Sequence, residues 1–280
     1  MTRAADTCFV ALDLEFTGLD PARDRIAEIG LVRFRGDVVE REDSTLIRSD
    51  RPMSAGAIAV TGITDSTLAN APLFAEIADT LRELLADAAL VCHNVPTDIG
   101  FLQREFSRTG LPFPPPDVAI DTLLLCRRLF SFPKNNLAEV CTRLGIDVPG
   151  HRALADARAT AAVLRRILAI LDPDGSLALD DIVTLVDALA PNSPLRLRQQ
   201  QVISDAWRHK RTVVIDYLST TDPVAGAVRR EVQVWAVRHP RFQGYCLLRG
   251  DERVFRLDRV TQVTPGDGTF DVPPDFRSRV

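Results

Sequence analysis

Two acidic residues stand inside an apolar segment near the N-terminus. Residues 9–16 are otherwise apolar and are followed by Thr17-Gly18, which predicts a central β-strand with a break after it. Asp13 and Glu15 lie two positions apart, so both side chains project from one face of that strand. Neighbouring carboxylates in an apolar strand repel each other and are costly to desolvate unless cations neutralise them. A strand end that simply emerges into water is the alternative interpretation.

Turn residues and hydrophobic periodicity predict the remaining elements of the N-terminal region. Two more strands are expected at 26–34 and 38–47, joined by a hairpin turn at Arg35-Gly36-Asp37. A short buried strand is expected at 89–92, and helices at 72–86, 99–110, 136–145 and 153–171. Strands first, and then strands mixed with helices, are typical of an α/β fold with a mixed sheet.

Two predicted helices begin close to further acidic residues. Asp98 follows His93-Asn94 and lies near the start of a helix, where a carboxylate is a good cap even without a metal. His151 stands in the loop before the long helix, and Asp156 lies within its first turns. A lone histidine in such a loop is usually a surface residue. Together, however, four carboxylates and a histidine can hold two divalent cations and activate a water against a phosphodiester.

These residues resemble the three motifs of the DEDDh 3′→5′ exonucleases. That family includes the proofreading epsilon subunit of bacterial DNA polymerase III and ribonuclease T. The motif segments are Asp13-Leu14-Glu15-x-Thr17-Gly18, His93-Asn94-x-x-x-Asp98 and His151-x-x-x-x-Asp156, with further likeness at Gly62-Ile63-Thr64 and Asp121-Thr122. The histidine five residues before the last aspartate marks the histidine class of the family. The likeness covers residues 6–172 and implies a ribonuclease H-like fold, a central mixed sheet flanked by helices.

The resemblance implies a two-metal-ion hydrolysis that releases nucleoside monophosphates from 3′ ends. In this mechanism Asp13, Glu15 and Asp156 bind the cation that carries the attacking water, and Asp13 also reaches the second cation. Asp98 supports the cluster directly or through water. His151 takes the proton from the attacking water. Hard oxygen ligands favour Mg²⁺, with Mn²⁺ as a substitute.

The resemblance also implies contacts with the terminal nucleotide. The backbone of Thr17-Gly18 would approach the nucleotide and its 3′-hydroxyl, Ile63 would wedge against the last base, and Asn94 would help hold the metal-site loops. Two positions depart from the family pattern: Thr97 replaces a Phe and Thr61 replaces a His. Neither position carries metal, so we expect substrate seating to differ rather than chemistry. Thr97 could equally be a helix cap.

Charge divides the chain into an acidic body and a basic tail. Residues 1–172 carry 19 Lys and Arg against 24 Asp and Glu, and residues 196–280 carry 15 basic against 10 acidic side chains. We therefore expect an exonuclease domain at 6–172, a helical linker at 173–195 and a small, mainly β domain at 196–280. The basic excess has two interpretations, a polyanionic partner or an ordinary solvated surface.

The tail resembles the WYL domain, a small Sm- or SH3-like β-barrel found mostly in bacterial regulators. The likeness covers residues 196–272 and rests on Ile215-Asp216-Tyr217 and on the run from Leu248 to Val260. The Trp-Tyr-Leu triplet that names the family is not intact, because Phe242-Gln243-Gly244-Tyr245-Cys246 occupies that region. The resemblance implies a role in sensing nucleic acid or nucleotide-like ligands.

Arginines in the tail are the candidate nucleic-acid contacts. Guanidinium groups close together suit phosphate, and aromatic rings nearby could stack on a base. The arginines are Arg249, Arg253, Arg256 and Arg259, and the aromatic candidates are Tyr217, Phe242 and Tyr245. Three interleaved acidic residues, Asp251, Glu252 and Asp258, could instead absorb the arginines as surface ion pairs. In that case the tail has a structural role or forms a homodimer.

Cysteine usage and hydropathy bear on the compartment. The five cysteines are scattered, odd in number and never in a C-x-x-C pair, which argues against disulfides and a zinc site. No apolar run of about 18 residues and no apolar signal core are found, so neither a membrane span nor secretion is predicted. These observations favour the cytoplasm.

The combined prediction is a metal-dependent 3′→5′ exonuclease whose tail aids nucleic-acid binding or regulates the enzyme. Single-stranded DNA 3′ ends are the expected substrate. An exoribonuclease is one alternative, because no motif reads the 2′-hydroxyl. A nucleic-acid- or ligand-sensing regulator that uses the nuclease fold as a scaffold is another. A proofreading subunit that serves a separate polymerase also stays open.

Overall fold

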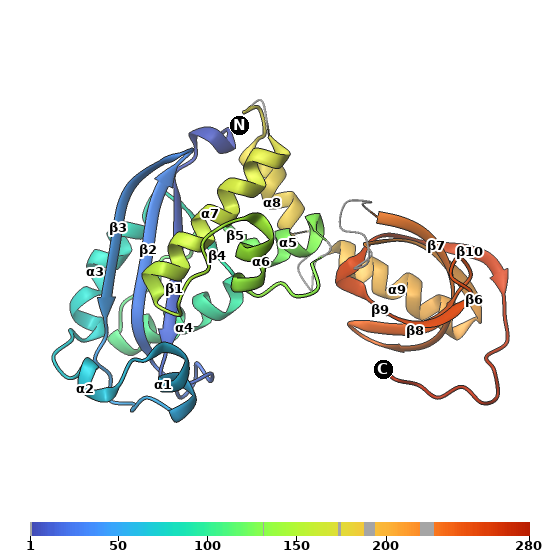
Figure 1. Cartoon of the computed structure of the whole chain (residues 1–280), viewed down its shortest axis with the longest axis horizontal. Helices are drawn as coiled ribbons and strands as arrows, with labels where there is room; N and C mark the ends of the chain where they lie inside the picture. Colours follow the sequence, from blue (N-terminus) through green and yellow to red (C-terminus); the bar gives the residue numbers. More distant parts are fainter. Residues whose placement is uncertain (1, 131, 173–174, 188–193, 219–226) are drawn as a thin grey trace. The chain divides into compact units, whose positions relative to one another are not determined.

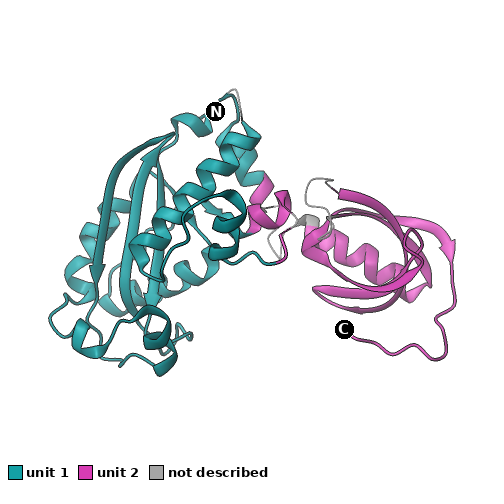
Figure 2. Cartoon of the chain, in the orientation of Figure 1, with its two compact units in different colours: residues 1–123, 134–184 teal, residues 124–133, 185–280 magenta. Residues whose placement is uncertain are grey.

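The computed structural model describes residues 2–130, 132–172, 175–187, 194–218 and 227–280. The chain divides into two compact units (Figure 2). The first unit contains residues 1–123 and 134–184, and the second contains 124–133 and 185–280. The sequence predicts a boundary within 173–195, whereas it gives no sign that 124–133 groups with the C-terminal region.

The first unit is built on a five-stranded mixed sheet with the order β3-β2-β1-β4-β5 (Figure 1). The strands are β1 (Phe9–Phe16), β2 (Ile26–Arg35), β3 (Val38–Leu46), β4 (Ala89–Cys92) and β5 (Ala119–Asp121). β1 pairs antiparallel with β2 and parallel with β4. The predicted α/β class with a central mixed sheet is confirmed.

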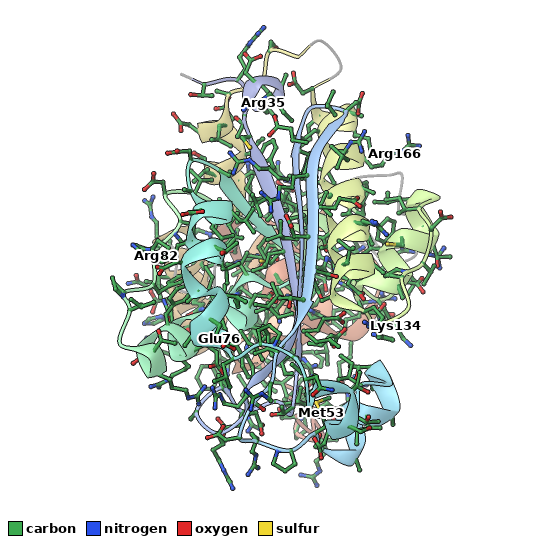
Figure 3. The ribbon with its side chains drawn as sticks, turned by 90° about the vertical axis from the view of Figure 1, so that its left-hand side faces the viewer. Arg35, Met53, Glu76, Arg82, Lys134 and Arg166 are labelled. Atoms are coloured by element: carbon green, nitrogen blue, oxygen red, sulfur yellow. The ribbon has the colours of Figure 1, made fainter. Side chains whose placement is uncertain are left out.

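Helices cover both faces of this sheet. The helical elements with residues in the first unit are η1 (Ala4–Asp6), α1 (Ala55–Thr61), α2 (Asp65–Leu68), α3 (Phe74–Leu85), α4 (Val95–Thr109), α5 (Thr122–Leu129), α6 (Leu137–Leu144), α7 (Ala153–Leu171) and α8 (Leu179–Asp187). Of these, α5 and α8 each contain residues of both units. Figure 3 shows α3, with Glu76 and Arg82, on one side of the strands and α7, with Arg166, on the other. α7 has the bounds that its N-terminal pattern and the following Asp-Pro predict.

Alternation along β1 separates apolar from acidic side chains. Leu12, Leu14 and Phe16 belong to a core cluster that includes side chains of α3 and α4. The ring of Phe16 stacks on that of Phe101, with 3.8 Å between the centroids. Burying a side chain of this size contributes about 1.5–3 kcal/mol, which anchors the apolar face of β1. Asp13 and Glu15 consequently project from the opposite face, which α7 covers.

Gly30 allows α7 to approach the sheet closely. Gly30 lies opposite Asp13 in the β1–β2 register. A Cβ built at Gly30 would lie 2.1 Å from the carbonyl carbon of Ala153, the first residue of α7. The missing side chain therefore places the N-terminal end of α7 directly over the part of the sheet that carries Asp13.

The second unit is a curved, five-stranded antiparallel sheet that packs against one helix (Figure 1). Its elements are α9 (Pro194–Arg208), β6 (Arg211–Leu218), β7 (Ala227–Arg238), β8 (Arg241–Cys246), β9 (Asp251–Arg256), η2 (Leu257–Arg259) and β10 (Val260–Thr269). Ile203 of α9 packs into the core formed by the inner face of the sheet. The sheet order is β10-β6-β7-β8-β9, and the mainly β fold agrees with the predicted WYL-like domain.

None of the five cysteines, Cys8, Cys92, Cys126, Cys141 and Cys246, forms a disulfide, and all five are buried. Burial raises the pKa of the Cys141 thiol to about 11, with a smaller contribution from Asp156. This thiol is therefore protonated and unreactive at neutral pH. Among the described residues, no helix combines the length and the apolar character needed to cross a membrane.

Candidate active site

Three carboxylates from two elements converge on one face of the sheet. Asp13 and Glu15 come from β1, and Asp156 comes from the first turn of α7. One oxygen of each carboxylate lies within 4.8 Å of the other two. Oxygens around an octahedral Mg²⁺ lie roughly 3–4 Å apart, given a metal–oxygen distance of ~2.1 Å. The donor set therefore suits a divalent cation, with only small side-chain adjustments.

Burial and mutual repulsion raise the pKa values of these carboxyls. Burial, followed by the charges of Asp98, Asp156 and Glu15, raises the pKa of Asp13 well above its ordinary value. Burial, followed by the charges of Asp156 and Glu28, raises the pKa of Glu15 to about 7. Burial also raises the pKa of Asp156. The charged cluster is consequently unfavourable without a cation, and a bound cation would relieve that cost.

Asp98 lies next to the three converging carboxylates and not among them. It is buried in the first turn of α4. Burial, with a contribution from Asp121, raises the pKa of Asp98 to about 8, although a hydrogen bond from the Cys92 thiol opposes the rise. The structure thus brings the predicted fourth carboxylate close enough for its charge to act on Asp13.

His151 stands exposed at the entrance to α7. Its backbone φ of 54° is in the left-handed region, which is uncommon for a residue with a Cβ. Burial dominates the pKa of Asp156, and the charge of His151 opposes that rise, so the imidazole lies near the carboxylates. The predicted base is therefore at the solvent-facing side of the cluster.

The second motif forms the entrance to α4. Asn94 has a φ of 112° and donates a 2.8 Å hydrogen bond from Nδ2 to Oγ1 of Thr97. The Asp121 carboxylate accepts a 3.1 Å hydrogen bond from the backbone N–H of Val95. His93 contacts Thr122 Oγ1 at 2.9 Å and the Asn135 carbonyl at 2.8 Å. These bonds hold the loop before Asp98.

The predicted structural role of Asn94 has a physical basis, and Thr97 bonds to Asn94 instead of being the N-cap residue.

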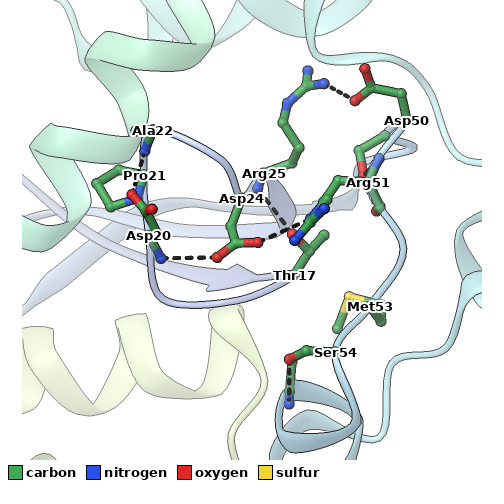
Figure 4. Close-up of polar contacts among 12 residues, drawn as sticks. Thr17, Asp20, Pro21, Ala22, Asp24, Arg25, Asp50, Arg51, Met53 and Ser54 are labelled. Atoms are coloured by element: carbon green, nitrogen blue, oxygen red, sulfur yellow. Dashed lines mark hydrogen bonds and ion pairs between the residues drawn. The ribbon is translucent and has the colours of Figure 1, made fainter.

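Thr17 and Gly18 shape the loop after β1, and Figure 4 shows Thr17 with Asp20, Asp24 and Arg25 of this loop. Thr17 is buried, and its Oγ1 accepts a 3.0 Å hydrogen bond from the backbone N–H of Arg25. A Cβ at Gly18 would lie 2.3 Å from Oδ2 of Asp24. The same Asp24 oxygen accepts a 2.9 Å hydrogen bond from the backbone N–H of Asp20. The loop thus requires a glycine for its own packing, and contact of its backbone with a nucleotide stays a prediction.

Ile63 lies in the loop between α1 and α2 and is only 2% exposed. It packs in a small core cluster with Ala27, Met53 and Leu68. A wedge against a terminal base would require the segment from α1 to α2 to shift. The wedge role stays a prediction for the substrate-bound protein.

Two residues at the site were not predicted from the sequence. Glu28 lies opposite Glu15 in the β1–β2 register and is 3% exposed. Its carboxylate accepts hydrogen bonds from the Arg152 guanidinium, at 2.7 Å from Nη2 and 3.0 Å from Nε. The available signal was one glutamate in the apolar first half of β2, but its partner lies 124 residues further along the chain.

The four predicted arginines of the second unit fall into two pairs. Arg253 binds Asp251 with bonds of 2.7 and 2.9 Å, and Arg256 binds Asp258 with bonds of 3.0 and 2.6 Å. For Arg249 and Arg259, no ion pair is found within the described residues. The ion-pair interpretation holds for Arg253 and Arg256, and contact of Arg249 and Arg259 with nucleic acid stays a prediction.

The predicted aromatic contacts also differ in accessibility. Tyr217 and Phe242 lie in the core of the second unit. Tyr245 is half-buried and stacks on Trp235 with 5.9 Å between the ring centroids. Of the three predicted rings, Tyr245 is therefore the one placed to meet a base.

Comparison with known proteins agrees with this site. A family profile described as Exonuclease (RNase_T) matches residues 10–164, more than half of the chain. The chain belongs to this exonuclease family. The match includes the sheet of the first unit and all four acidic residues of the site. A second profile, described as WYL domain, matches residues 199–265 of the same chain.

Similar proteins include subunits of replicative polymerases. The DNA polymerase III subunit epsilon of Rickettsia felis is 38% identical over 162 residues, which cover 55% of this exonuclease-family chain and 71% of the relative. The PolC-type DNA polymerase III of Thermotoga maritima is 36% identical over 186 residues, covering 66% of this chain and 14% of the relative. The chain therefore spans only a small part of the PolC-type relatives. Exonuclease X in complex with 5′ overhanging duplex DNA is 27% identical, with a TM-score of 0.50, and the match covers 64% of this chain and 99% of that one.

Proposed function

We propose that this protein is a metal-dependent exonuclease that hydrolyses phosphodiesters from the 3′ end of a nucleic acid and releases nucleoside monophosphates. The observation that carries the proposal is the convergence of Asp13, Glu15 and Asp156 within 4.8 Å of one another. Their raised pKa values indicate a cluster arranged for cations. Membership of the exonuclease family supports the reaction class.

Asp13, Glu15 and Asp156 would hold the divalent cations, with Asp13 facing both. The carboxylate oxygens favour Mg²⁺, and Mn²⁺ is a suitable substitute. When bound, two such ions stabilise the attacking and leaving oxygens of an in-line displacement. Asp98 adds negative charge beside Asp13 and so strengthens the attraction of the site for cations.

His151 is the proposed general base. Its exposed position at the entrance to α7 lets the imidazole accept a proton from the attacking water and pass it to solvent. Its nearness to Asp156 keeps the imidazole close to the reacting phosphate. General base catalysis of this kind typically contributes about 10²–10⁴-fold to the rate.

The proposed substrate is the single-stranded 3′ end of DNA. The similar proteins, which include a DNA polymerase III subunit epsilon and an exonuclease in complex with 5′ overhanging duplex DNA, support DNA over RNA. The second unit would aid binding through Arg249 and Arg259, whose guanidinium groups have no carboxylate partner within the described residues. Association with a polymerase, as for the epsilon subunits, is a further proposal.

The proposal is tested with labelled oligonucleotides. Single- and double-stranded DNA and single-stranded RNA, each labelled at the 3′ or the 5′ end, are incubated with Mg²⁺, Mn²⁺ or EDTA. We expect release of labelled mononucleotide from 3′-labelled DNA and progressive shortening of 5′-labelled DNA, both abolished by EDTA. Asp13→Asn and His151→Ala should each lower the rate by about 10²–10⁴-fold, whereas Asp79→Asn, at an exposed position of α3, should not.

Other outcomes separate the alternatives. Faster degradation of RNA would replace DNA as the substrate. Binding of oligonucleotides without loss of label, under every metal condition, would contradict the enzyme and favour the regulator.

A further inference from the structure

Glu28 and Arg152 form a bonded pair at the foot of α7 that the proposed mechanism does not use. We infer that this pair, called here the Glu28–Arg152 clamp, positions His151 for proton transfer. The inference rests on the proposed function, because it assigns Glu28 and Arg152 as positioning residues for the proposed base. It adds a strand of the sheet to the machinery that sets the geometry of the base.

The clamp holds the residue after His151 at three points. The guanidinium of Arg152 bonds to both carboxylate oxygens of Glu28. The backbone N–H of Arg152 donates a 2.9 Å hydrogen bond to Oδ2 of Asp156. The backbone N–H of Ala153 donates a 3.1 Å hydrogen bond to Oε2 of Glu28. The Arg152 side chain and the start of α7 at Ala153 are thus tied to Glu28 of β2, and the Arg152 backbone is tied to Asp156 within α7.

Glu28 is well suited to this role because it is rigid. It is 3% exposed and belongs to β2, which lies between β3 and β1 in the sheet. Gly30, two residues along the same strand, contacts the backbone of Ala153 and fixes the height of α7 over the sheet. A buried carboxylate without its cation is strongly unfavourable, so Glu28 keeps Arg152 in place.

The backbone of His151 needs such support. A φ of 54° is unfavourable for a residue other than glycine and persists only where the surroundings enforce it. On the C-terminal side of His151, the bonds of Arg152 and Ala153 supply such restraint. Without the clamp, the imidazole would sample other positions and spend less time near the carboxylates.

The clamp also sets the charge beside the cation ligands. Glu28 lies opposite Glu15 in the β1–β2 register, and the Arg152 guanidinium bonds to the Glu28 carboxylate. Loss of either partner would thus leave one unbalanced charge beside the site, and both single variants should impair the reaction.

The chain supplies a matched control. Arg158, further along α7, forms a similar two-oxygen pair with Glu42 of β3, with Nε–oxygen distances of 3.0 and 3.1 Å. This second pair also joins α7 to the sheet, but neither residue adjoins a residue of the site. Glu42→Gln and Arg158→Gln therefore remove an equivalent helix-to-strand pair without touching His151.

The test compares Arg152→Gln, Glu28→Gln, Glu42→Gln and Arg158→Gln in the full chain, each alone and combined with His151→Ala. Single-turnover rates on 3′-labelled single-stranded DNA should fall about tenfold for the clamp variants, with little change in KM, and stay unchanged for the controls. In the His151→Ala background the clamp variants should cost almost nothing further, because residues that act as a unit are not additive.

A structural readout accompanies the kinetics. The chain has 4 histidines, so the imidazole resonance of His151 can be assigned by its loss in His151→Ala. That resonance should shift or broaden in the clamp variants and not in the controls, and thermal unfolding shows whether each variant is folded. Arg152 is 54% exposed, so Arg152→Gln leaves no buried cavity. The Glu28→Gln, Arg152→Gln double variant removes the uncompensated buried carboxylate and serves where the single variant is unfolded.

Several results would overturn the inference. Rate losses that multiply with His151→Ala would assign the clamp to general stability, and a raised KM with unchanged kcat would make Arg152 a substrate contact. An unchanged His151 resonance in Arg152→Gln would contradict the positioning directly. An inactive wild-type protein would instead defeat the proposed function, and the resonance measurement would still decide whether the clamp orders His151.

Discussion

At the scale of single residues, Asp13 carries a charge that the proposed cation site needs but that destabilises the fold when no cation is bound. Its pKa is raised by burial and by the charges of four neighbouring carboxylates, so its charge opposes folding when no cation is bound. We expect Asp13→Asn to reduce exonuclease activity by about three orders of magnitude and to raise the unfolding temperature in EDTA. Thermal unfolding with and without Mg²⁺ provides the check, since Mg²⁺ should stabilise the wild type more than the variant.

Glu15 and Asp98 make the stability of the metal-free protein depend on pH. Burial leads the causes that raise their pKa values from 4.5 to about 7 and from 3.8 to about 8, respectively. Between these limits the folded protein binds more protons than the unfolded chain, so stability falls as the pH rises through this window. In EDTA we expect the unfolding temperature to drop by several degrees from pH 5 to pH 8. Saturating Mg²⁺ should remove most of the drop, and an equal drop in both conditions would contradict this account.

At the scale of elements, the fit of α7 against β2 sets the site. A Cβ at Gly30 would lie 2.1 Å from the backbone of Ala153, so Gly30→Ala must push the start of α7 away from Asp13. We expect a loss of about 1–3 kcal/mol in urea unfolding and a marked loss of activity. Gly56→Ala is the control, because a Cβ in that helix meets nothing within 4 Å. This control should be neutral or stabilise by up to about 1 kcal/mol.

The elements also show what a sequence can and cannot reveal. The start of α6 is predictable because Asn136 accepts a 2.9 Å bond from the N–H of Glu139, and Gly145 ends the helix with a φ of 68°. α1, α2 and β5 contain only 7, 4 and 3 residues, too few for a periodic pattern. β10 was missed because Pro265 and two glycines within it are typical of a turn.

The same reasoning explains the candidate site. Asp13 and Glu15 were predictable because a period of two places both on one face of a strand. Their convergence with Asp156 was predictable only through the family resemblance, since no local rule joins β1 to α7. The Glu28–Arg152 clamp joins positions 124 residues apart and leaves no local pattern. The buried position of Ile63 depends on tertiary packing with Ala27 and Met53.

At the scale of the whole molecule, we expect the second unit to bind single-stranded DNA through Arg249 and Arg259, for which no ion pair is found among the described residues. Each phosphate contact contributes about 0.7 to the slope of log affinity against log salt for a single strand. We expect the Arg249→Gln, Arg259→Gln double variant to lower this slope by up to about 1.4 and to weaken binding of single-stranded DNA. Arg253→Gln with Arg256→Gln should change the slope less, because carboxylates already neutralise both side chains. Fluorescence anisotropy of labelled oligonucleotides over a range of salt concentrations measures both. Equal slopes in all three proteins would assign the tail a structural or dimerising role.

The buried thiols of the chain can serve as natural probes of the transient opening of each unit. Cys8, Cys92 and Cys141 are buried residues of the first unit, and Cys126 and Cys246 are buried residues of the second. An alkylating reagent can reach them only when the surrounding structure opens. Mass spectrometry of partly alkylated protein would then measure the rate of opening of each unit separately, without any engineered probe. The same measurement would reveal whether nucleotide or magnesium slows the opening of one unit while the other unit continues to open at its former rate.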